Sequence, residues 1–256
     1  VTGTGSMTVP IPTSPGRSGF GPQLSLSYDS GAGNGPFGFG WSLSLPAITR
    51  KTEKGLPKYL DGYGQGADSD VFILSGSEDL VPEFEKDVTG NWVIEDDKYV
   101  VHDKPRTVDG ITYRVRRYRP RIEGLFARIE RWTNKDKPEH TFWRSISKDN
   151  ITTWYGKTAE SRIQDPADPS RIFSWLICES YDDKGNVMSY GYKDENSGEI
   201  DTSQAHERNR SVDSRKSNRY LKHLRYGNHD PYFPRLEETA PWPIVPESDQ
   251  WYFHVV

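Results

Sequence analysis

The apolar residues of this chain alternate with polar residues in short runs, and this spacing favours β-strands over helices. Apolar side chains alternate with serines from Leu24 to Tyr28, and the run from Trp41 to Leu45 repeats the pattern. A period of two places alternate side chains on one face of a strand. Almost no stretch keeps the helical period of 3.6 over ten residues. The pattern therefore predicts an all-β fold.

The two runs are joined by residues 31–40, which include five glycines, and they predict a hairpin with a long loop. Leu24, Leu26 and Tyr28 are expected to face the same core as Trp41, Leu43 and Leu45. Several of the loop glycines are expected to have positive φ, where a Cβ is unfavourable. The same small residues should let the rings of Phe37 and Phe39 lie against the neighbouring backbone.

Further strands are predicted at intervals of about 8–12 residues, with polar turns between them, which is typical of a β-meander. They span residues 71–74, 91–94, 98–101, 111–118, 125–132, 140–147, 151–155 and 220–226. Residues 161–164 are expected to form one helical turn. The five prolines between residues 231 and 246 predict an extended, irregular segment.

Composition bears on what can fill the core of such a fold. Hydrophobic residues make up 33% of the chain, below the usual ~45–50%. Aromatic residues make up 12%, and each buried ring removes a large apolar area from water. The sequence therefore predicts a core built mainly from rings. The chain has a single cysteine, Cys178, which excludes an internal disulfide and a cysteine-based zinc site. Cys178 lies in an apolar run and is expected to be buried.

The balance of charge argues against two classes of partner. The 33 basic and 37 acidic residues leave a net charge of −4, which disfavours a dedicated nucleic-acid binder. No apolar run approaches the ~20 residues that a membrane-spanning helix needs. The start of the chain also lacks the pattern of a secretory signal peptide.

A polar segment divides the chain into three parts. Residues 193–218 are almost entirely polar and predict a mobile linker or loop, because too little apolar surface is present to offset ordering. Residues 1–192 are then the main β domain, and residues 219–256 return to it. The chain starts without methionine and stops within a strand-like run, so we expect it to be a piece of a longer polypeptide, truncated at its C-terminus.

None of the candidate catalytic or ligand motifs is complete. Residues 33–38 match the letters GxGxxG, but the alternating run that follows cannot begin the helix that would hold a pyrophosphate. The six histidines lack metal-ligand spacing, and the DDKGN run at residues 182–186 reads as a β-turn rather than a calcium loop. We therefore expect no cofactor, no metal and no catalytic residues.

The arginine-rich run at residues 113–121 has two interpretations. Arginines interleaved with aromatic rings can bind a polyanion. In a strand, however, Tyr113 and Val115 face one way and Arg114 and Arg116 the other, and Glu123 and Glu130 are nearby partners. An ion-paired strand face, or a contact between modules, is the favoured interpretation.

Several motifs carry a resemblance to a known family. They are the N-terminal block at residues 3–22, LSLSYDSG at 24–31, and the group Gly35, Pro36, Phe37, Gly38, Gly40 and Trp41. Further matches follow in family order at residues 70–76, 142–144, 155–157, 175–176 and 220–222. Together they resemble the SpvB-type N-terminal domain, which opens the B components of insecticidal toxin complexes and the Salmonella virulence plasmid protein SpvB.

One segment of this chain, residues 181–190, also resembles a YD (Rhs-type) repeat. Tyr181 and Asp182 would begin the repeat, and Gly185 and Asn186 would turn the chain before the next strand. Residues 28–31 are a weaker echo of the repeat. These motif residues are our candidate structural site.

The resemblance implies a wall and not an enzyme. In toxin complexes the B and C components form a hollow shell of spiralling β-strip that encloses a cytotoxic region, and a propeller elsewhere in B docks on a pore-forming A component. The implied partners are the rest of the B component, the C-type toxin component and, indirectly, the A-type component. The implied location is secreted or extracellular, with cytoplasmic residence before export.

Two alternatives stay open. In the first, the chain is the non-catalytic N-terminal region of an ADP-ribosyltransferase toxin. The catalytic motifs of such an enzyme are an Arg, a Ser-Thr-Ser strand and a Glu-x-Glu turn, and this chain has only fragments of the last two, at residues 75–77 and 83–85. Glycan binding through Trp92 or Trp242, which both fall near turns, is the other alternative.

Overall fold

The chain folds almost entirely into β-strands, as the alternation predicts. The computed structural model describes residues 3–53, 55–61, 68–75, 79–124, 126–196, 198 and 200–256. In these ranges the helical elements are short: η1 (Arg17–Gly19), η2 (Ala159–Ser161), η3 (Ala205–Glu207) and α1 (Val212–Arg215). The fold is all-β.

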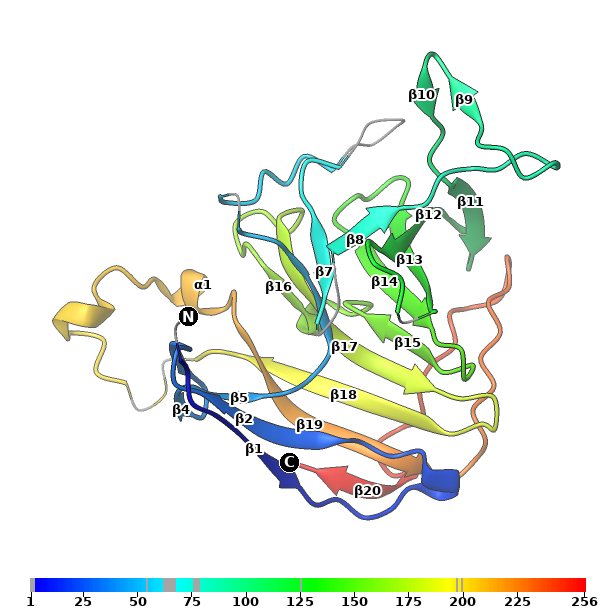
Figure 1. The fold of residues 1–256 in the computed structure, drawn as a ribbon. Helices are drawn as coiled ribbons and strands as arrows, with labels where there is room; N and C mark the ends of the chain where they lie inside the picture. Colours follow the sequence, from blue (N-terminus) through cyan, green and yellow to red (C-terminus); the bar gives the residue numbers. More distant parts are fainter. Residues whose placement is uncertain are drawn as a thin grey trace.

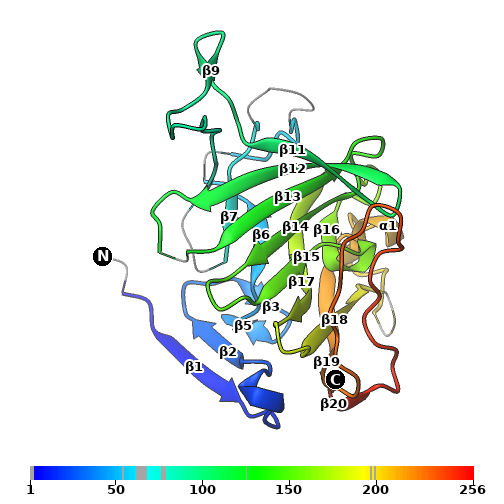
Figure 2. The same cartoon turned by 90° about the vertical axis from the view of Figure 1, so that its right-hand side faces the viewer.

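Eight antiparallel strands of the described chain close into a barrel (Figures 1 and 2). The ring closes because β17 pairs with β15 along one part of its length and with β6 along another. In spatial order the strands are β6 (Ala47–Arg50), β7 (Phe72–Leu74), β8 (Asp79–Pro82), β12 (Ile111–Pro120), β13 (Arg128–Asn134), β14 (Thr141–Ile146), β15 (Thr152–Tyr155) and β17 (Ile172–Tyr181).

Shorter strands extend this ring at two places. Beside β12 lies β11 (Asp103–Val108), and beside β17 lies β16 (Arg162–Gln164). A strip also leaves the barrel through β18 (Val187–Asp194), β19 (Arg219–Asn228) and β20 (Trp251–Val255), so that β20 forms the end of the sheet.

The N-terminal residues form a separate sheet next to this strip (Figure 1). It has the order β1 (Ser6–Ile11), β2 (Leu24–Asp29) and β5 (Trp41–Leu43). The pairs Leu26–Leu43 and Tyr28–Trp41 confirm the predicted hairpin. The Tyr226 hydroxyl donates to the Ser14 carbonyl at 2.8 Å and ties the sheet to β19.

The barrel interior is filled by aromatic rings, as the composition predicts. Phe72 contacts Trp143, Trp175 and Tyr118, with ring centroids 5.0, 5.7 and 6.0 Å apart. All four side chains are buried, together with Ile48. An eight-stranded barrel is just wide enough for side chains to fill, so the barrel is a packed core and not a channel.

The outer face of the barrel is also covered. Trp132, Phe142 and Trp154 lie on this face, and Trp242 from the proline-rich segment 231–246 packs on them at 5.7–6.0 Å. Figure 2 shows this segment running along the outside of the barrel. Cys178 is buried in the same cluster, as predicted. Both faces of the sheet are therefore covered here, which is why β13 is buried at nearly every position.

Several predicted strands are confirmed, and others need correction. The segments predicted at 111–118, 140–147, 151–155 and 220–226 correspond to β12, β14, β15 and β19. The helical turn expected at 161–164 is wrong beyond Ser161. Arg162–Gln164 instead forms β16, because Arg162 pairs with Trp175 and its guanidinium donates to the Gly156 and Glu139 carbonyls. The alternation did not predict β1 or β11.

The glycine-rich loop holds a small hairpin of β3 (Asn34–Gly35) and β4 (Gly38–Phe39). Gly38 and Gly40 have positive φ, as expected for part of the loop. The expected packing of Phe37 and Phe39 on the backbone is wrong, because their side chains are 51% and 64% exposed.

Candidate interaction surface

The most prominent surface feature is an arm formed by residues 83–102, which projects from the barrel between β8 and β11 (Figures 1 and 2). Its outer hairpin pairs β9 (Ile94–Glu95) with β10 (Lys98–Tyr99). The turn between them is made by Asp96 and Asp97, both at positive φ, which matches the two-residue turns that suit the twist of a hairpin.

The arm is anchored to the barrel by backbone hydrogen bonds. The Glu83 amide donates to the Arg117 carbonyl at 2.9 Å, and the Arg117 amide donates to the His102 carbonyl at 3.1 Å. Further out, the amides of Glu85 and Val93 continue the ladder. The arm is therefore an extension of the β12 sheet and not an irregular loop.

Three aromatic rings lie together on the arm. Phe84, Trp92 and Tyr99 have centroids 5.3 to 6.5 Å apart. Their side chains are 39%, 47% and 53% exposed, although each has ring neighbours. The Lys86 ammonium lies 4.5 Å from the centre of the Trp92 ring. These rings are separate from the buried clusters of the barrel, and contiguous exposed apolar groups of this kind mark interaction sites.

The arm also carries an excess of negative charge. Residues 83–102 include six carboxylates (Glu83, Glu85, Asp87, Glu95, Asp96 and Asp97) and two lysines. Glu85 binds two basic groups, His102 Nδ1 at 3.2 Å and Lys104 Nζ at 2.9 Å. Burial alone would raise the pKa of Glu85, but Lys104 and His102 together lower it.

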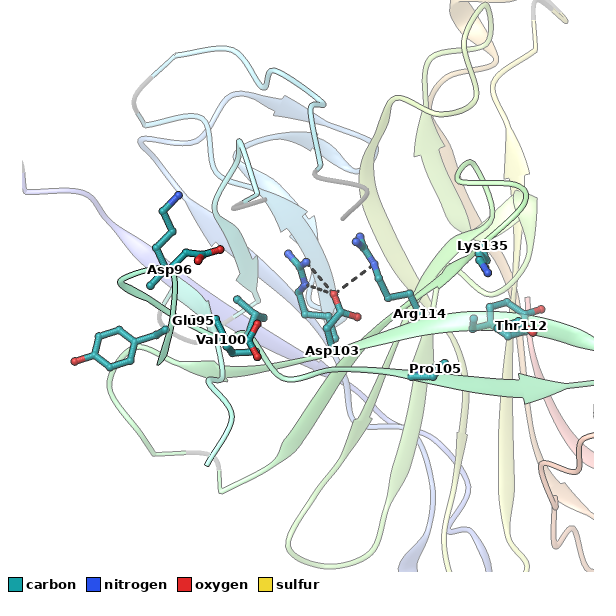
Figure 3. A pocket seen from close by; sticks show the side chains of 13 residues that line it. Glu95, Asp96, Val100, Asp103, Pro105, Thr112, Arg114 and Lys135 are labelled. Carbon is teal, nitrogen blue, oxygen red and sulfur yellow. Dashed lines mark hydrogen bonds and ion pairs between the residues drawn. The ribbon is translucent and has the colours of Figure 1, made fainter. Parts of the chain in front are cut away.

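A hollow of about 570 Å³ lies between the arm and the start of β12 (Figure 3). Asp103 accepts from Arg116 Nη2 at 2.9 Å and lies 3.5 Å from Arg114 Nε. A second hollow on the other flank is lined by Phe84, Trp92 and His102, among others. The charged groups at the back of the first hollow bind one another, so this arrangement suits docking better than catalysis.

The arginine-rich strand is an ion-paired face; of the two expected partners, Glu130 pairs with Arg117, whereas Glu123 does not pair with this strand in the described residues. Burial is almost complete for Arg116, which binds Asp68 Oδ1 at 3.2 Å as well as Asp103. Glu130 lies 4.0 Å from Arg117 but binds Arg144 at 2.6 Å. The Glu123 carboxylate accepts from the Phe126 amide instead.

A charge cluster inside the barrel mouth was missed by sequence reasoning. Asp68 Oδ1 lies 2.7 Å from Arg131 Nη2, and its other oxygen accepts from the Tyr118 hydroxyl at 2.5 Å. Arg50 binds Asp61 and, at 2.8 Å, Asp70. The aspartates come from a polar turn-rich stretch, and only the tertiary fold brings them to the arginines.

The predicted motif residues fall into two separate places. Gly35, Pro36, Phe37, Gly38 and Gly40 belong to the loop of the N-terminal sheet, and Trp41 begins β5, where its ring lies 5.3 Å from Tyr28. The second set, at the turn after β17, consists of Tyr181, Asp182, Gly185 and Asn186. Figure 1 shows the two places near opposite ends of β18, so they do not form one site.

The second set forms a tightly bonded turn. Asp182 Oδ1 accepts from the amides of Lys184 and Asn186, both at 2.9 Å. Gly185 has φ 83°, and its carbonyl accepts from the Asn228 side chain at 2.8 Å. A Cβ at Gly185 would lie 2.8 Å from Pro231 Cβ. The turn therefore joins β17, β19 and the proline-rich segment.

The polar segment 193–218 contains its own buried ion pair. Glu207 binds Arg215 at 2.5 Å, and both side chains are buried. Residues 193 and 194 continue β18. The proposed three-part division and the mobility of this segment stay predictions.

Metal-ligand clusters and membrane-spanning helices are both missing from the described part of the chain. There, no group of three or more His, Cys, Asp or Glu side chains is placed to hold a metal ion. No described helix has the length and apolar character that crossing a membrane requires.

Comparisons with known proteins match the whole chain. The profile of the family described as Salmonella virulence plasmid 65kDa B protein matches residues 1–256. The mono(ADP-ribosyl)transferase SpvB of Salmonella typhimurium is 35% identical over 263 residues, which cover 99% of this chain and 39% of that protein. The chain thus spans about two fifths of the length of this curated relative.

Solved structures resemble the chain as well. The N-terminal domain of the effector protein SpvB from Salmonella typhimurium strain LT2 has a TM-score of 0.71 at 35% identity, over 88% of this chain and 64% of that one. The TcdB2-TccC3 structure has a TM-score of 0.76 at 28% identity, over 98% of this chain and 11% of that one. For the Tc holotoxin pore of Photorhabdus luminescens the TM-score is 0.75 at 28% identity, with 98% and 10% covered.

Proposed function

The chain belongs to the SpvB family, that of the Salmonella virulence plasmid 65kDa B protein, and on this basis we propose that it is a non-catalytic wall segment of a toxin-enclosing shell. It would help to contain and deliver a cytotoxic effector. Its partners would be the rest of a B-type component, a C-type toxin component and, through other domains, an A-type pore-forming component. The protein would act outside the bacterium that makes it.

The observation that carries this proposal is the likeness to TcdB2-TccC3, which extends over 98% of this chain but only 11% of the matched chain. A segment that makes up so small a share of a large chain is suited to a structural role. The match to an N-terminal domain of SpvB supports the same non-catalytic role.

The fold suits a wall. The barrel interior is filled by buried side chains, and a second buried cluster covers part of the outer face, so the barrel encloses no channel. In the described residues, β1 and β20 pair on one side only, and unpaired strand edges are templates for pairing with further chain. The strip β18–β20 would then be continued by neighbouring strands of the shell.

The second candidate is a non-catalytic region that precedes an ADP-ribosyltransferase domain. It is supported by the 35% identity to the mono(ADP-ribosyl)transferase SpvB. Within this chain, the Glu83 and Glu85 pair belongs to the arm, where Glu85 binds His102 and Lys104. Gly76 and Ser77 of the other fragment lie outside the described residues.

Protease protection tests the proposal. The full-length protein that carries this chain is co-expressed with a C-type component, and the complex is treated with protease under native conditions. The proposal predicts that the cytotoxic region is protected in the complex and digested when it is expressed alone. Digestion at equal rates would overturn it. The chain by itself should transfer no label from NAD, and transfer above a heat-treated control would overturn the non-catalytic assignment.

A further inference from the structure

We infer that the arm, residues 83–102, is a docking site for a basic, partly apolar polypeptide segment. This inference stands on the geometry and charge of the arm and does not depend on the encapsulation proposal. No comparison assigns a role to the arm.

The first reason is the exposed ring cluster. Phe84, Trp92 and Tyr99 contact one another but keep about half of their area in solvent. Aromatic residues are enriched in the cores of interfaces and among the residues that contribute most to binding. Ile94, 58% exposed on the same hairpin, enlarges the apolar surface.

The second reason is the charge around the rings. The arm carries six carboxylates against two lysines. Glu95, Asp96 and Asp97 form the exposed outer turn, and no ion pair of theirs is found among the described residues. Complementary charge therefore selects a basic partner over an acidic one.

The third reason is that the arm already binds basic groups of its own chain. The Lys86 ammonium lies 4.5 Å above the Trp92 ring, which shows that a cation fits this aromatic face. The Glu85 carboxylate binds two basic side chains, those of His102 and Lys104. A partner with alternating basic and apolar side chains would use the same two kinds of contact.

The mounting of the arm makes docking feasible. Backbone hydrogen bonds join its base to β12, so the rings are held in place before a partner arrives. Hollows lie on both flanks of the arm, and Figure 3 shows the one next to β11 and β12. Both are lined in part by Tyr99, so they give an extended segment room beside this ring. Pre-organised surfaces lose less entropy on binding.

Calorimetry with the 256-residue chain tests the inference. The probe is a 16-residue synthetic peptide in which lysine or arginine alternates with leucine, and a second peptide has glutamate at every basic position. The basic peptide should bind at least tenfold more tightly than the acidic one. The Trp92→Ala and Tyr99→Ala variants should each weaken its binding about tenfold.

Two further variants separate arm binding from other effects. Phe126→Ala removes a ring that is 69% exposed outside the arm and should leave binding unchanged. Glu95→Lys with Asp97→Asn keeps the rings in place and should weaken binding several-fold, with a smaller dependence on salt. Equal binding of both peptides, or no effect of Trp92→Ala, would overturn the inference. Arm-dependent self-association in sedimentation, or arm-dependent binding to polysaccharides instead of the basic peptide, would overturn it as well.

Discussion

Replacing Asp68 by alanine should destabilise the barrel strongly, because this carboxylate is paired with two buried guanidinium groups. Asp68 lies 2.7 Å from Arg131 and 3.2 Å from Arg116, and both arginines are 1% exposed. It also accepts a hydrogen bond from the hydroxyl of the buried Tyr118. Removing one partner of a buried ion pair costs about 3–5 kcal/mol, a large share of the ~5–15 kcal/mol that stabilises a typical domain.

The assay is denaturant unfolding of the chain, with Asp168→Ala as the matched control. The Asp168 side chain is 42% exposed and binds Arg171 at 3.0 Å, and it also accepts from the Ser170 amide and hydroxyl. Its loss should therefore change the free energy of unfolding by no more than about 1 kcal/mol. If the folded Asp68→Ala protein loses less than about 1 kcal/mol, the interior cluster does not stabilise the barrel.

The pH dependence of the same difference is a second readout. Burial alone would raise the pKa of Asp68, but Arg131, the Tyr118 hydroxyl and Arg116 together lower it below its ordinary value of 3.8. A carboxyl with a lowered folded-state pKa contributes stability above the unfolded-state pKa and loses it as pH falls through the folded-state value. The difference between the wild type and Asp68→Ala should therefore be constant near neutral pH and shrink below about pH 4. A difference that grows on acidification would contradict the assigned ionisation.

Three other tests address separate parts of the fold. Gly40→Val should lower the free energy of unfolding by about 1–3 kcal/mol, since the glycine has φ 79° and a Cβ would lie 2.6 Å from the Tyr28 ring. Gly38→Val should lower it by only about 1 kcal/mol, because φ is positive there but no atom lies near the Cβ position. Equal losses for the two variants in denaturant titration would refute this distinction. Trp242→Ala should lower the free energy of unfolding by about 2 kcal/mol and speed hydrogen exchange of the Gly110 amide, which donates to the Glu238 carbonyl. Unchanged exchange would show that the proline-rich segment stays bound to the barrel without the Trp242 ring. Trypsin should cut the polar segment 193–218 first after Arg208, which is exposed, and later after Arg215, which is buried with Glu207. First cleavage in β12 or β13 would contradict the prediction that residues 193–218 are mobile.

Strand positions were predictable because alternation is local. Residues 111–118 and 140–147 carry the pattern in their own sequence, and both are strands. The closure of the barrel was not predictable, since it depends on pairing of β17 with β6, which is more than a hundred residues away along the chain. No local pattern specifies such a contact, and β11, with Lys104, Pro105 and Arg106, lacks the alternation altogether.

The same limit applies to the functional surface. The turn at Asp182 and Gly185 was predictable because the hydrogen bonds of the turn lie within five residues. The ring cluster of the arm joins residues 84, 92 and 99 across two turns, and the exposure of its members depends on how far the arm projects. The interior cluster around Asp68 likewise joins residues that are far apart in sequence. Spacing alone indicates neither.

Electron cryo-microscopy of the full-length protein in complex with its C-type component tests the central proposal most directly. The proposal predicts a closed shell in which this barrel forms part of the wall, with β20 continued by a neighbouring strand and density for enclosed polypeptide inside. A barrel that lies apart from any enclosed cavity, with the edge of β20 in solvent, would contradict it.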